Sequence, residues 1–194
     1  YTSVSARLWP HAEPSCALVA LGGYGRAELN PYSDIDLLFL CGNKPDEQMK
    51  QLIDGVLYPL WDLGFTVGHS ARTIEDTLLY ARRDTTVLTA LLEARLLVGP
   101  EAVFARLEER LNKSLLPKYA REFIRRKIEE RDHRYQQYEK SPTVLEPNLK
   151  ESPGGLRDLH TTLWLTRLAY GYRSFQQLEE ERFCEPEEVL ELHS

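Results

Sequence analysis

The sequence predicts an α+β fold over residues 1–114, followed by an all-helical region over residues 115–194. Three short apolar runs next to glycine, proline or asparagine are typical of buried strands: residues 17–21, 35–40 and 65–71. From residue 101 onward the pattern changes to long stretches with charge pairs at helical spacing. A chain of 194 residues can hold one sizeable core or two small ones, so we expect two domains with these boundaries.

Helices are expected where a capping residue precedes an apolar pattern of helical spacing. Asp46 can cap a helix that Gly64 ends, with a kink or break at Pro59. Thr73, which opens a capping-box pattern, and Asp84 can cap two more. The expected helices span residues 47–63, 74–82, 85–98, 101–112, 115–140, 156–170 and 187–192.

The bulk composition is that of an ordinary soluble domain. Hydrophobic residues make up 42% and charged residues 28%, and no apolar run approaches the length that spans a membrane. The net charge of −6 argues against a nucleic-acid-binding surface, although a small basic pocket for a nucleotide is compatible with it. Three cysteines far apart argue against a zinc site or a disulfide framework and favour the cytoplasm. Because the start carries neither Met nor a signal peptide, we expect part of a longer cytoplasmic protein.

Two aspartates stand at the start of the second apolar run, in LGGYGRAELNPYSDIDLLFL, residues 21–40. Side chains in a strand alternate between faces, so Asp34 and Asp36 share one face. A buried carboxylate is costly unless it is paired or holds a metal, and oxygen ligands on one face suit a hard cation such as Mg²⁺. Taken alone, Asp-x-Asp is usually a turn or a solvated strand end.

Residues upstream of the aspartates can hold phosphate. Gly22 and Gly23 free the backbone to turn its N–H groups toward an anion, while Arg26 and Ser33 add side-chain donors. The stretch does not fit a dinucleotide fingerprint, because Glu28 stands where the third glycine belongs, and no Gly-Lys-Ser/Thr follows as in a Walker A loop. The combination predicts a site for a metal ion and a nucleoside triphosphate.

Paired glycines followed by hydrophobic-Asp-hydrophobic-Asp make this stretch resemble the nucleotidyltransferase fold of the polymerase-beta type. Together with GFTVGHSARTIEDTL, LLEARLLVGP and LEPNLKESPGGLRDLHTTLWL, it resembles the uridylyltransferases of the PII nitrogen-signalling protein. The last segment is also similar to glutamine-synthetase adenylyltransferases.

The resemblance implies a fold, a reaction and a set of site residues. It implies a small mixed sheet with helices, a helical domain after it, and transfer of UMP from UTP to a tyrosine hydroxyl of PII with release of pyrophosphate. Asp34 and Asp36 would be the catalytic Mg²⁺ ligands, and Gly22 and Gly23 would hold the phosphates.

A second glycine pair, in NLKESPGGLRD, leads into the expected helix over residues 156–170. A helix start with exposed N–H groups is a natural anion site, to which Lys150 and Arg157 would add charge. The plainer alternative is a helix entry with ordinary caps and a salt bridge of Arg157 and Asp158 between domains. The resemblance favours nucleotide binding by Lys150 and Arg157, with the helical part closing over the nucleotide.

Enzymes of this superfamily usually supply a third carboxylate from a later strand, but residues 65–71 contain none. Three acidic residues elsewhere are candidates for that role: Glu93, Glu151 and Asp158. Two alternatives stay open, namely AMP transfer from ATP to glutamine synthetase or another protein, and a nucleotide-binding regulatory module without catalysis. Uridylyl removal and ligand sensing are not assigned, because the chain lacks the His-Asp motifs of a hydrolytic metal domain.

Overall fold

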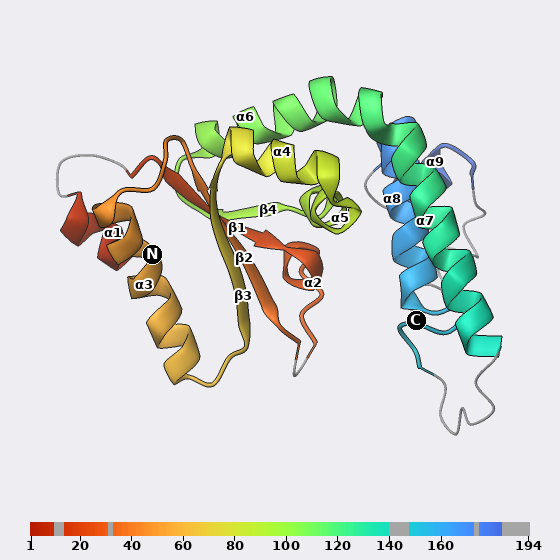
Figure 1. Ribbon diagram of the computed structural model, residues 1–194, viewed down its shortest axis with the longest axis horizontal. Coiled ribbons are helices and arrows are strands. Elements are labelled where there is room, and N and C mark those ends of the chain that lie inside the picture. Colours follow the sequence, from red (N-terminus) through yellow and green to blue (C-terminus); the bar gives the residue numbers. More distant parts are fainter. Residues whose placement is uncertain (10–13, 31–32, 140–147, 173–174, 184–194) are drawn as a thin grey trace. The chain divides into compact units, whose positions relative to one another are not determined.

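The computed structural model describes residues 1–9, 14–30, 33–139, 148–172 and 175–183. These residues form an α+β protein with a four-stranded sheet of order β3-β2-β1-β4 (Figure 1). The strands are β1 (Cys16–Leu21), β2 (Ile35–Cys41), β3 (Val67–Thr73) and β4 (Arg95–Val98). Because β1 pairs antiparallel with β2 and β4 while β2 pairs parallel with β3, the sheet is mixed, as expected.

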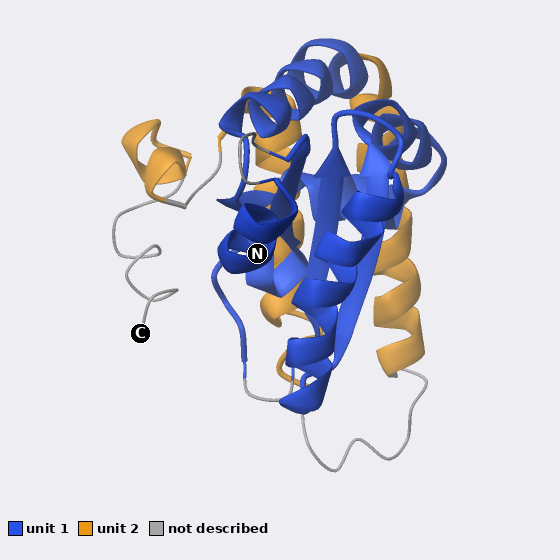
Figure 2. Cartoon of the chain, turned by 90° about the vertical axis from the view of Figure 1, so that its left-hand side faces the viewer, with its two compact units in different colours: residues 1–117 blue, residues 118–194 orange. Residues whose placement is uncertain are grey.

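The chain forms two compact units, Tyr1–Pro117 and Lys118–Ser194 (Figure 2). In the first unit the sheet is accompanied by α1 (Thr2–Leu8), α2 (Gly22–Gly25), α3 (Glu47–Asp62), α4 (Ile74–Arg83), α5 (Thr85–Leu92), α6 (Glu101–Arg110) and the π-helical segment η1 (Leu111–Leu115). The described part of the second unit contains most of α7 (Leu116–Glu139), with α8 (Leu156–Tyr170) and α9 (Phe175–Glu180). A division at residue 114 into two separate domains stays a prediction.

The main core lies between one face of the sheet and helices α1 and α3. Alternating residues of β1 and β2, such as Leu18 and Phe39, meet the apolar stripe of α3, including Leu52 and Leu57. These side chains are almost completely buried, and their removal from water is the main stabilisation of the sheet. Helices α4, α5 and α6 cover the other side (Figure 1), so the first unit has three layers.

Two free cysteines face each other at one end of this core. Cys16 and Cys41 are register partners on β1 and β2, both are fully buried, and their Sγ atoms lie 3.5 Å apart. The opposite end of the same ladder pairs Leu21 with Asp36.

The expected helix caps are confirmed. The Asp46 carboxylate accepts a hydrogen bond from the Met49 N–H at 2.9 Å, and Asp84 caps α5 in the same way. Thr73 caps α4 by accepting from the Asp76 N–H at 3.1 Å. The expected break at Pro59 does not occur, since α3 continues to Asp62. Only about one turn follows Pro59, so the helix loses a single hydrogen bond there.

Other expectations need correction or fall outside the described residues. The helix expected over 85–98 ends at Leu92, and residues 95–98 form β4 instead. The apolar run over these residues is compatible with a helix or a strand. It forms a strand because it pairs with the open edge of β1. Helices α1, α2 and α9 were not expected, whereas α8 matches the expected span. The helix expected over 187–192 lies outside the described residues.

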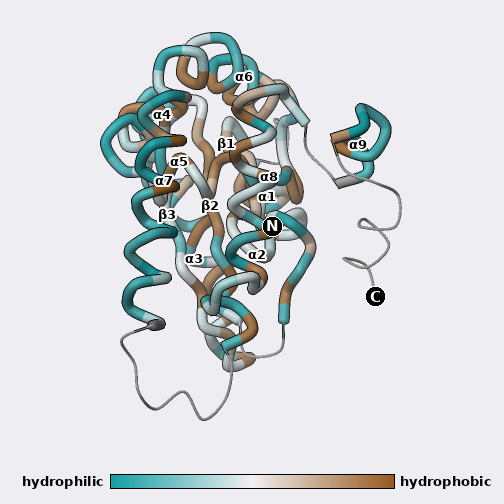
Figure 3. The backbone as a smooth tube through the Cα atoms, turned by 90° about the vertical axis from the view of Figure 1, so that its right-hand side faces the viewer, coloured by the Kyte–Doolittle hydropathy of each residue, from teal (hydrophilic) through white to brown (hydrophobic). Residues whose placement is uncertain are grey.

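Helix α7 is rich in charged residues. Figure 3 shows this helix as hydrophilic along much of its length, and Glu122 pairs with Arg125 and Arg126 on its exposed surface. Lys127 is buried instead, with its Nζ atom 4.9 Å from the Trp164 ring of α8 and 2.9 Å from Glu130. In the described residues no helix is both long and apolar enough to cross a membrane.

Candidate active site

The two aspartates of the predicted metal site lie at the start of β2. Asp34 precedes the strand by one residue and is exposed, and Asp36 is its second residue. Every residue of β2 except Asp36 is buried, so the carboxylate is the one break in an otherwise apolar strand. Because Asp36 pairs with Leu21 of β1 and with Gly68 of β3, it projects from the middle of the sheet rather than from its edge.

The Asp36 carboxylate lies between two glycines, Gly22 and Gly68, which we call the glycine cradle. A Cβ atom on Gly68 would stand 2.5 Å from Asp36 Oδ1, closer than such atoms approach in real structures. A Cβ on Gly22 would stand 3.2 Å from Asp36 Oδ2, and Gly22 also has a φ of +56°, which side-chain-bearing residues rarely adopt. The cradle therefore reserves this space for the carboxylate and for whatever it binds.

The electrostatics of Asp36 fit a cation site. Burial raises the pKa of the Asp36 carboxyl above its ordinary value, and the negative charge of Asp34 raises it further. A cation placed beside Asp36 would offset the repulsion that Asp34 exerts on its ionised form. Oxygen donors of this kind suit a divalent ion such as Mg²⁺, so the residues present fit the metal that the sequence predicts.

The paired glycines open a one-turn helix, α2, rather than a loop. Gly22 and Gly23 are its first residues, and Arg26 is its C-cap. The guanidinium of Arg26 is held by two carboxylates: Glu28 at 2.7 Å and Glu93 at 2.5 Å. The structure thus places Arg26 beside the glycine pair, with its donors turned toward these two acids.

Helix α2 is fixed to the end of α5 by close contacts. A Cβ on Gly25 would stand 2.2 Å from the Glu93 carbonyl oxygen, so only glycine allows this approach. Arg95 on β4 donates to the carbonyl oxygens of Tyr24 at 2.7 Å and Gly25 at 3.1 Å. These contacts hold the first glycines of α2 in position beside Asp36.

The described residues contain no third carboxylate at the site, and no group of three or more potential metal ligands. On β3 the positions that share the face of Asp36 are Gly68, Ser70 and Arg72, none of them acidic. Glu93 is almost completely buried in its ion pair with Arg26. Of the three candidates it is the one in the first unit, and its contacts are those of a residue that positions Arg26.

The other two candidates belong to a polar cluster in the second unit. Burial alone would raise the pKa of Asp158, but hydrogen bonds from the Tyr135 hydroxyl at 2.5 Å and the Gly154 N–H at 2.7 Å, with the charge of Arg134, lower it overall. Asp158 is therefore an ionised residue of the first turn of α8, held by Tyr135, Gly154 and Arg134.

Lys150 and Arg157, the predicted phosphate ligands of the helical part, also lie at the start of α8. Lys150 is an exposed residue of the preceding turn, where its N–H donates to Asn148 Oδ1 at 3.0 Å. The Arg157 guanidinium pairs with Glu151 at 2.9 Å, and this hydrogen bond lowers the pKa of Glu151. Nucleotide binding by Lys150 and Arg157 stays a prediction.

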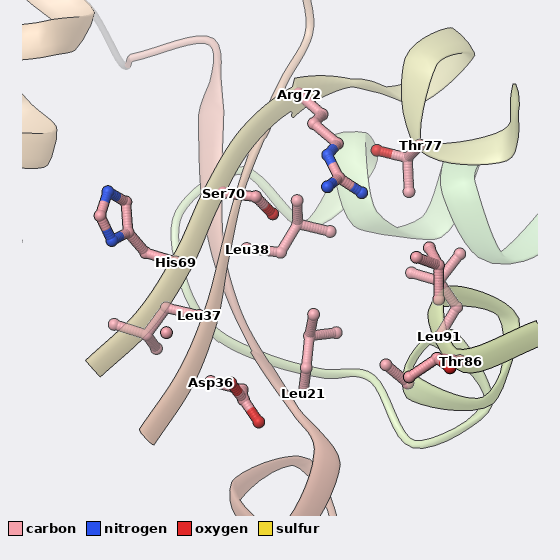
Figure 4. Close-up of a pocket in the computed structure, with 13 residues that line it drawn as sticks. Leu21, Asp36, Leu37, Leu38, His69, Ser70, Arg72, Thr77, Thr86 and Leu91 are labelled. Carbon is pink, nitrogen blue, oxygen red and sulfur yellow. The ribbon is translucent and has the colours of Figure 1, made fainter. Parts of the chain in front are cut away.

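A cavity of about 290 Å³ opens beside Asp36 on the face of the sheet that α4 and α5 cover (Figure 4). Ser70 and Arg72 point into it from β3, whereas His69 points away and stacks edge-on against Trp61. Ser33, a predicted phosphate ligand, is exposed just before the strand, and its N–H donates to the Asn30 carbonyl oxygen at 3.0 Å.

Beyond Asp36, and His69 as a possible substrate contact, sequence reasoning missed the residues that line this cavity. Its outer wall comes from α5, with Thr86, Val87 and Leu91 among its residues, and these look like ordinary core positions in the sequence. The alternation of side chains along β3 could have indicated Ser70 and Arg72, because both share the face of Asp36 once β2 and β3 are paired.

Comparison with known proteins confirms the resemblance inferred from the sequence. Residues 122–194 match the family model described as GlnD PII-uridylyltransferase. The bifunctional uridylyltransferase/uridylyl-removing enzyme of Azospirillum brasilense is 43% identical over 89% of this chain, and that of Hydrogenovibrio crunogenus is 43% identical over 97%. The alignments cover 18% and 21% of those proteins, so the chain spans about a fifth of their length.

One solved structure, described as a toxin-antitoxin with AMP-PNP, shows 18% identity and a TM-score of 0.34 over 60% of this chain and 90% of that one. A likeness at this level carries no argument about fold or function.

Proposed function

Because this chain is a relative of the bifunctional uridylyltransferase/uridylyl-removing enzymes over nearly its whole length, we propose that it performs their nucleotidyl transfer. The donor is UTP, and the acceptor is a tyrosine hydroxyl of a PII-type signalling protein. The phenolic oxygen forms a bond to the α-phosphorus as the bond to the β-phosphate oxygen breaks. UMP is then joined to the tyrosine, pyrophosphate leaves, and the phenolic proton passes to solvent.

The position of Asp36 in the glycine cradle is the observation that carries this proposal. Asp36 is the one exposed residue of an otherwise buried strand, and its pKa is raised by partial burial and by the charge of Asp34. A cation held by both carboxylates would offset that repulsion. Asp34 and Asp36 would together hold Mg²⁺, which neutralises charge on the α-phosphate and on the departing pyrophosphate. The nucleotidyltransferase fold of the polymerase-beta type, with its strand, glycine pair and Asp-x-Asp strand, is part of the same proposal.

The residues around the metal site supply space and position. The cradle leaves room for phosphate oxygens close to the backbone, because Gly22 and Gly68 have no side chains there. Arg26 lies at the end of α2, where its ion pairs with Glu28 and Glu93 hold the guanidinium beside the glycine pair.

The test is transfer by the intact protein, with UTP, Mg²⁺ and a PII-type acceptor, read by the mass of the acceptor. Asp36→Asn should abolish the added UMP, since an amide is a poorer metal ligand than a carboxylate. Its melting temperature should be unchanged or higher, because the raised pKa of Asp36 means that the ionised carboxylate destabilises the folded state.

Asp54→Asn is the matched control, because Asp54 is an exposed carboxylate on α3 and the same atoms change. This variant should transfer UMP at the wild-type rate. Wild-type transfer by Asp36→Asn would refute the metal site. Transfer of AMP from ATP would instead make the protein an adenylyltransferase, and nucleotide binding without any transfer would make it a regulatory module.

A further inference from the structure

The cavity beside Asp36 changes character along its length (Figure 4). Paired positions on β2 and β3 lead from Asp36–Gly68 through Leu38–Ser70 to Leu40–Arg72, and all six residues share one face of the sheet. At about 3.3 Å per residue, the first and last of these pairs lie roughly 13 Å apart. The cavity is therefore acidic at one end, apolar in the middle and basic at the other.

Arg72 is a half-buried cation whose donors face the cavity. Its guanidinium lies 4.3 Å from the centre of the Tyr80 ring, and among the residues that the structure describes it has no carboxylate partner. Arg26 and Arg95, by contrast, are committed to carboxylates and backbone carbonyls. The ring of Tyr80 restrains the Arg72 side chain without using its N–H groups, which leaves them for a ligand.

The middle of the cavity is apolar, with Leu21 and Leu38 on the sheet and Val87 and Leu91 on α5. A triphosphate would lose its hydration on such a wall without gaining partners, whereas the flat face of a nucleobase would be buried favourably. If the phosphates lie at Asp34 and Asp36, the base reaches the apolar section and its edge meets Ser70 and Arg72.

We propose that Arg72 and Ser70 read the edge of the nucleobase and select a pyrimidine that presents carbonyl oxygens, as uracil does. The inference rests on the proposed function, which places the triphosphate at the metal site. The Arg72 guanidinium and the Ser70 hydroxyl can both donate to the carbonyl oxygens of uracil. Because the guanidinium is a donor only, the exocyclic amino group of adenine or cytosine would meet another donor at Arg72. A site built to hydrogen-bond one edge rejects a base that leaves its buried polar groups unpaired.

The experiment compares the dissociation constants of UTP, CTP and ATP for the intact protein by calorimetry with Mg²⁺, without the acceptor. In Arg72→Met, affinity for UTP should fall about tenfold or more while affinity for ATP is unchanged. Arg72→Lys keeps the charge but not the planar fork, and should lose the preference for UTP with the fold intact. Arg83→Met is the control, because Arg83 is exposed at the end of α4.

Four results would each contradict base recognition by Arg72. An equal loss of UTP and ATP affinity would mean that Arg72 binds phosphate, and an unchanged preference would mean that it does not touch the nucleotide; either result overturns the inference. Equal binding of all three nucleotides by the wild type, lost in Asp36→Asn, would overturn base reading alone. Failure of the wild type to bind any nucleotide would overturn the proposed function and this inference with it.

Discussion

Gly68→Ala is the smallest change that tests whether the Asp36 carboxylate must lie where it does. The new Cβ would stand 2.5 Å from Asp36 Oδ1, and such contacts are essentially never shorter than 3.0 Å. Either the carboxylate or the strand must therefore move by about 0.5 Å or more, which is a large displacement for a metal ligand. Misplacement of a reacting group by about 1 Å can cost a hundredfold in rate, so we expect UMP transfer to slow by roughly tenfold to a hundredfold.

The assay is the rate of transfer as a function of Mg²⁺ concentration at saturating UTP, beside thermal unfolding. Gly68→Ala should need more Mg²⁺ and reach a lower maximum, with a melting temperature close to that of the wild type. Gly64→Ala is the control: its φ of +84° strains the backbone, but the added methyl group enters open space. It should lower stability and leave transfer intact. Wild-type kinetics in folded Gly68→Ala would show that catalysis does not depend on this carboxylate position.

Two further predictions concern charged groups around the site and in the second unit. Glu93→Gln should lower the free energy of unfolding by about 1–3 kcal/mol, because the Glu93 carboxylate is 6% exposed and paired with Arg26, while the Mg²⁺ dependence of transfer stays unchanged. A lost Mg²⁺ dependence at an unchanged melting temperature would instead make Glu93 the missing metal ligand. Lys150→Ala and Arg157→Ala should each slow single-turnover transfer about tenfold to a hundredfold if these side chains bind phosphate. If Arg157 serves its ion pair with Glu151 alone, its loss would cost at most about 1 kcal/mol of stability and no activity.

Much of the sheet could be predicted because its strands carry local signals. Strand β1 is a short apolar run that ends at a glycine pair, and β2 is a short apolar run that follows a stretch containing proline and asparagine. The bounds of each strand differ from the expected ones by a single residue. The three side-chain caps were also predictable, since an N-cap needs only a carboxylate or hydroxyl and a free N–H group two or three residues later.

Strand β4 could not be predicted from its own residues. Its apolar run continues the helical pattern of α5, and the reason for its extended form is the open edge of β1, which is distant in sequence. The same holds for the tight contact of Gly25 with the Glu93 carbonyl, which depends on how α2 and α5 meet.

The candidate site likewise contains some features that local sequence predicts and others that depend on contacts between distant segments. Asp34, Asp36, Gly22 and Gly23 stand within one short stretch, and β1, α2 and β2 follow one another directly along it. The role of Gly68 depends on the register between β2 and β3, and two strands separated by a helix can pair in more than one register. Arg72 becomes visible as a ligand only when that register is known.

The buried pair Cys16 and Cys41 gives the sheet an internal reporter. Both thiols are fully shielded in the folded protein, so an alkylating reagent can reach them only while β1 and β2 are separated or their cover is removed. The labelling rate at these two positions, followed by peptide mass, therefore measures how often that end of the ladder opens. Since Asp36 lies at the other end of the same two strands, a ligand that tightens the ladder as a whole would slow the labelling of cysteines it never touches.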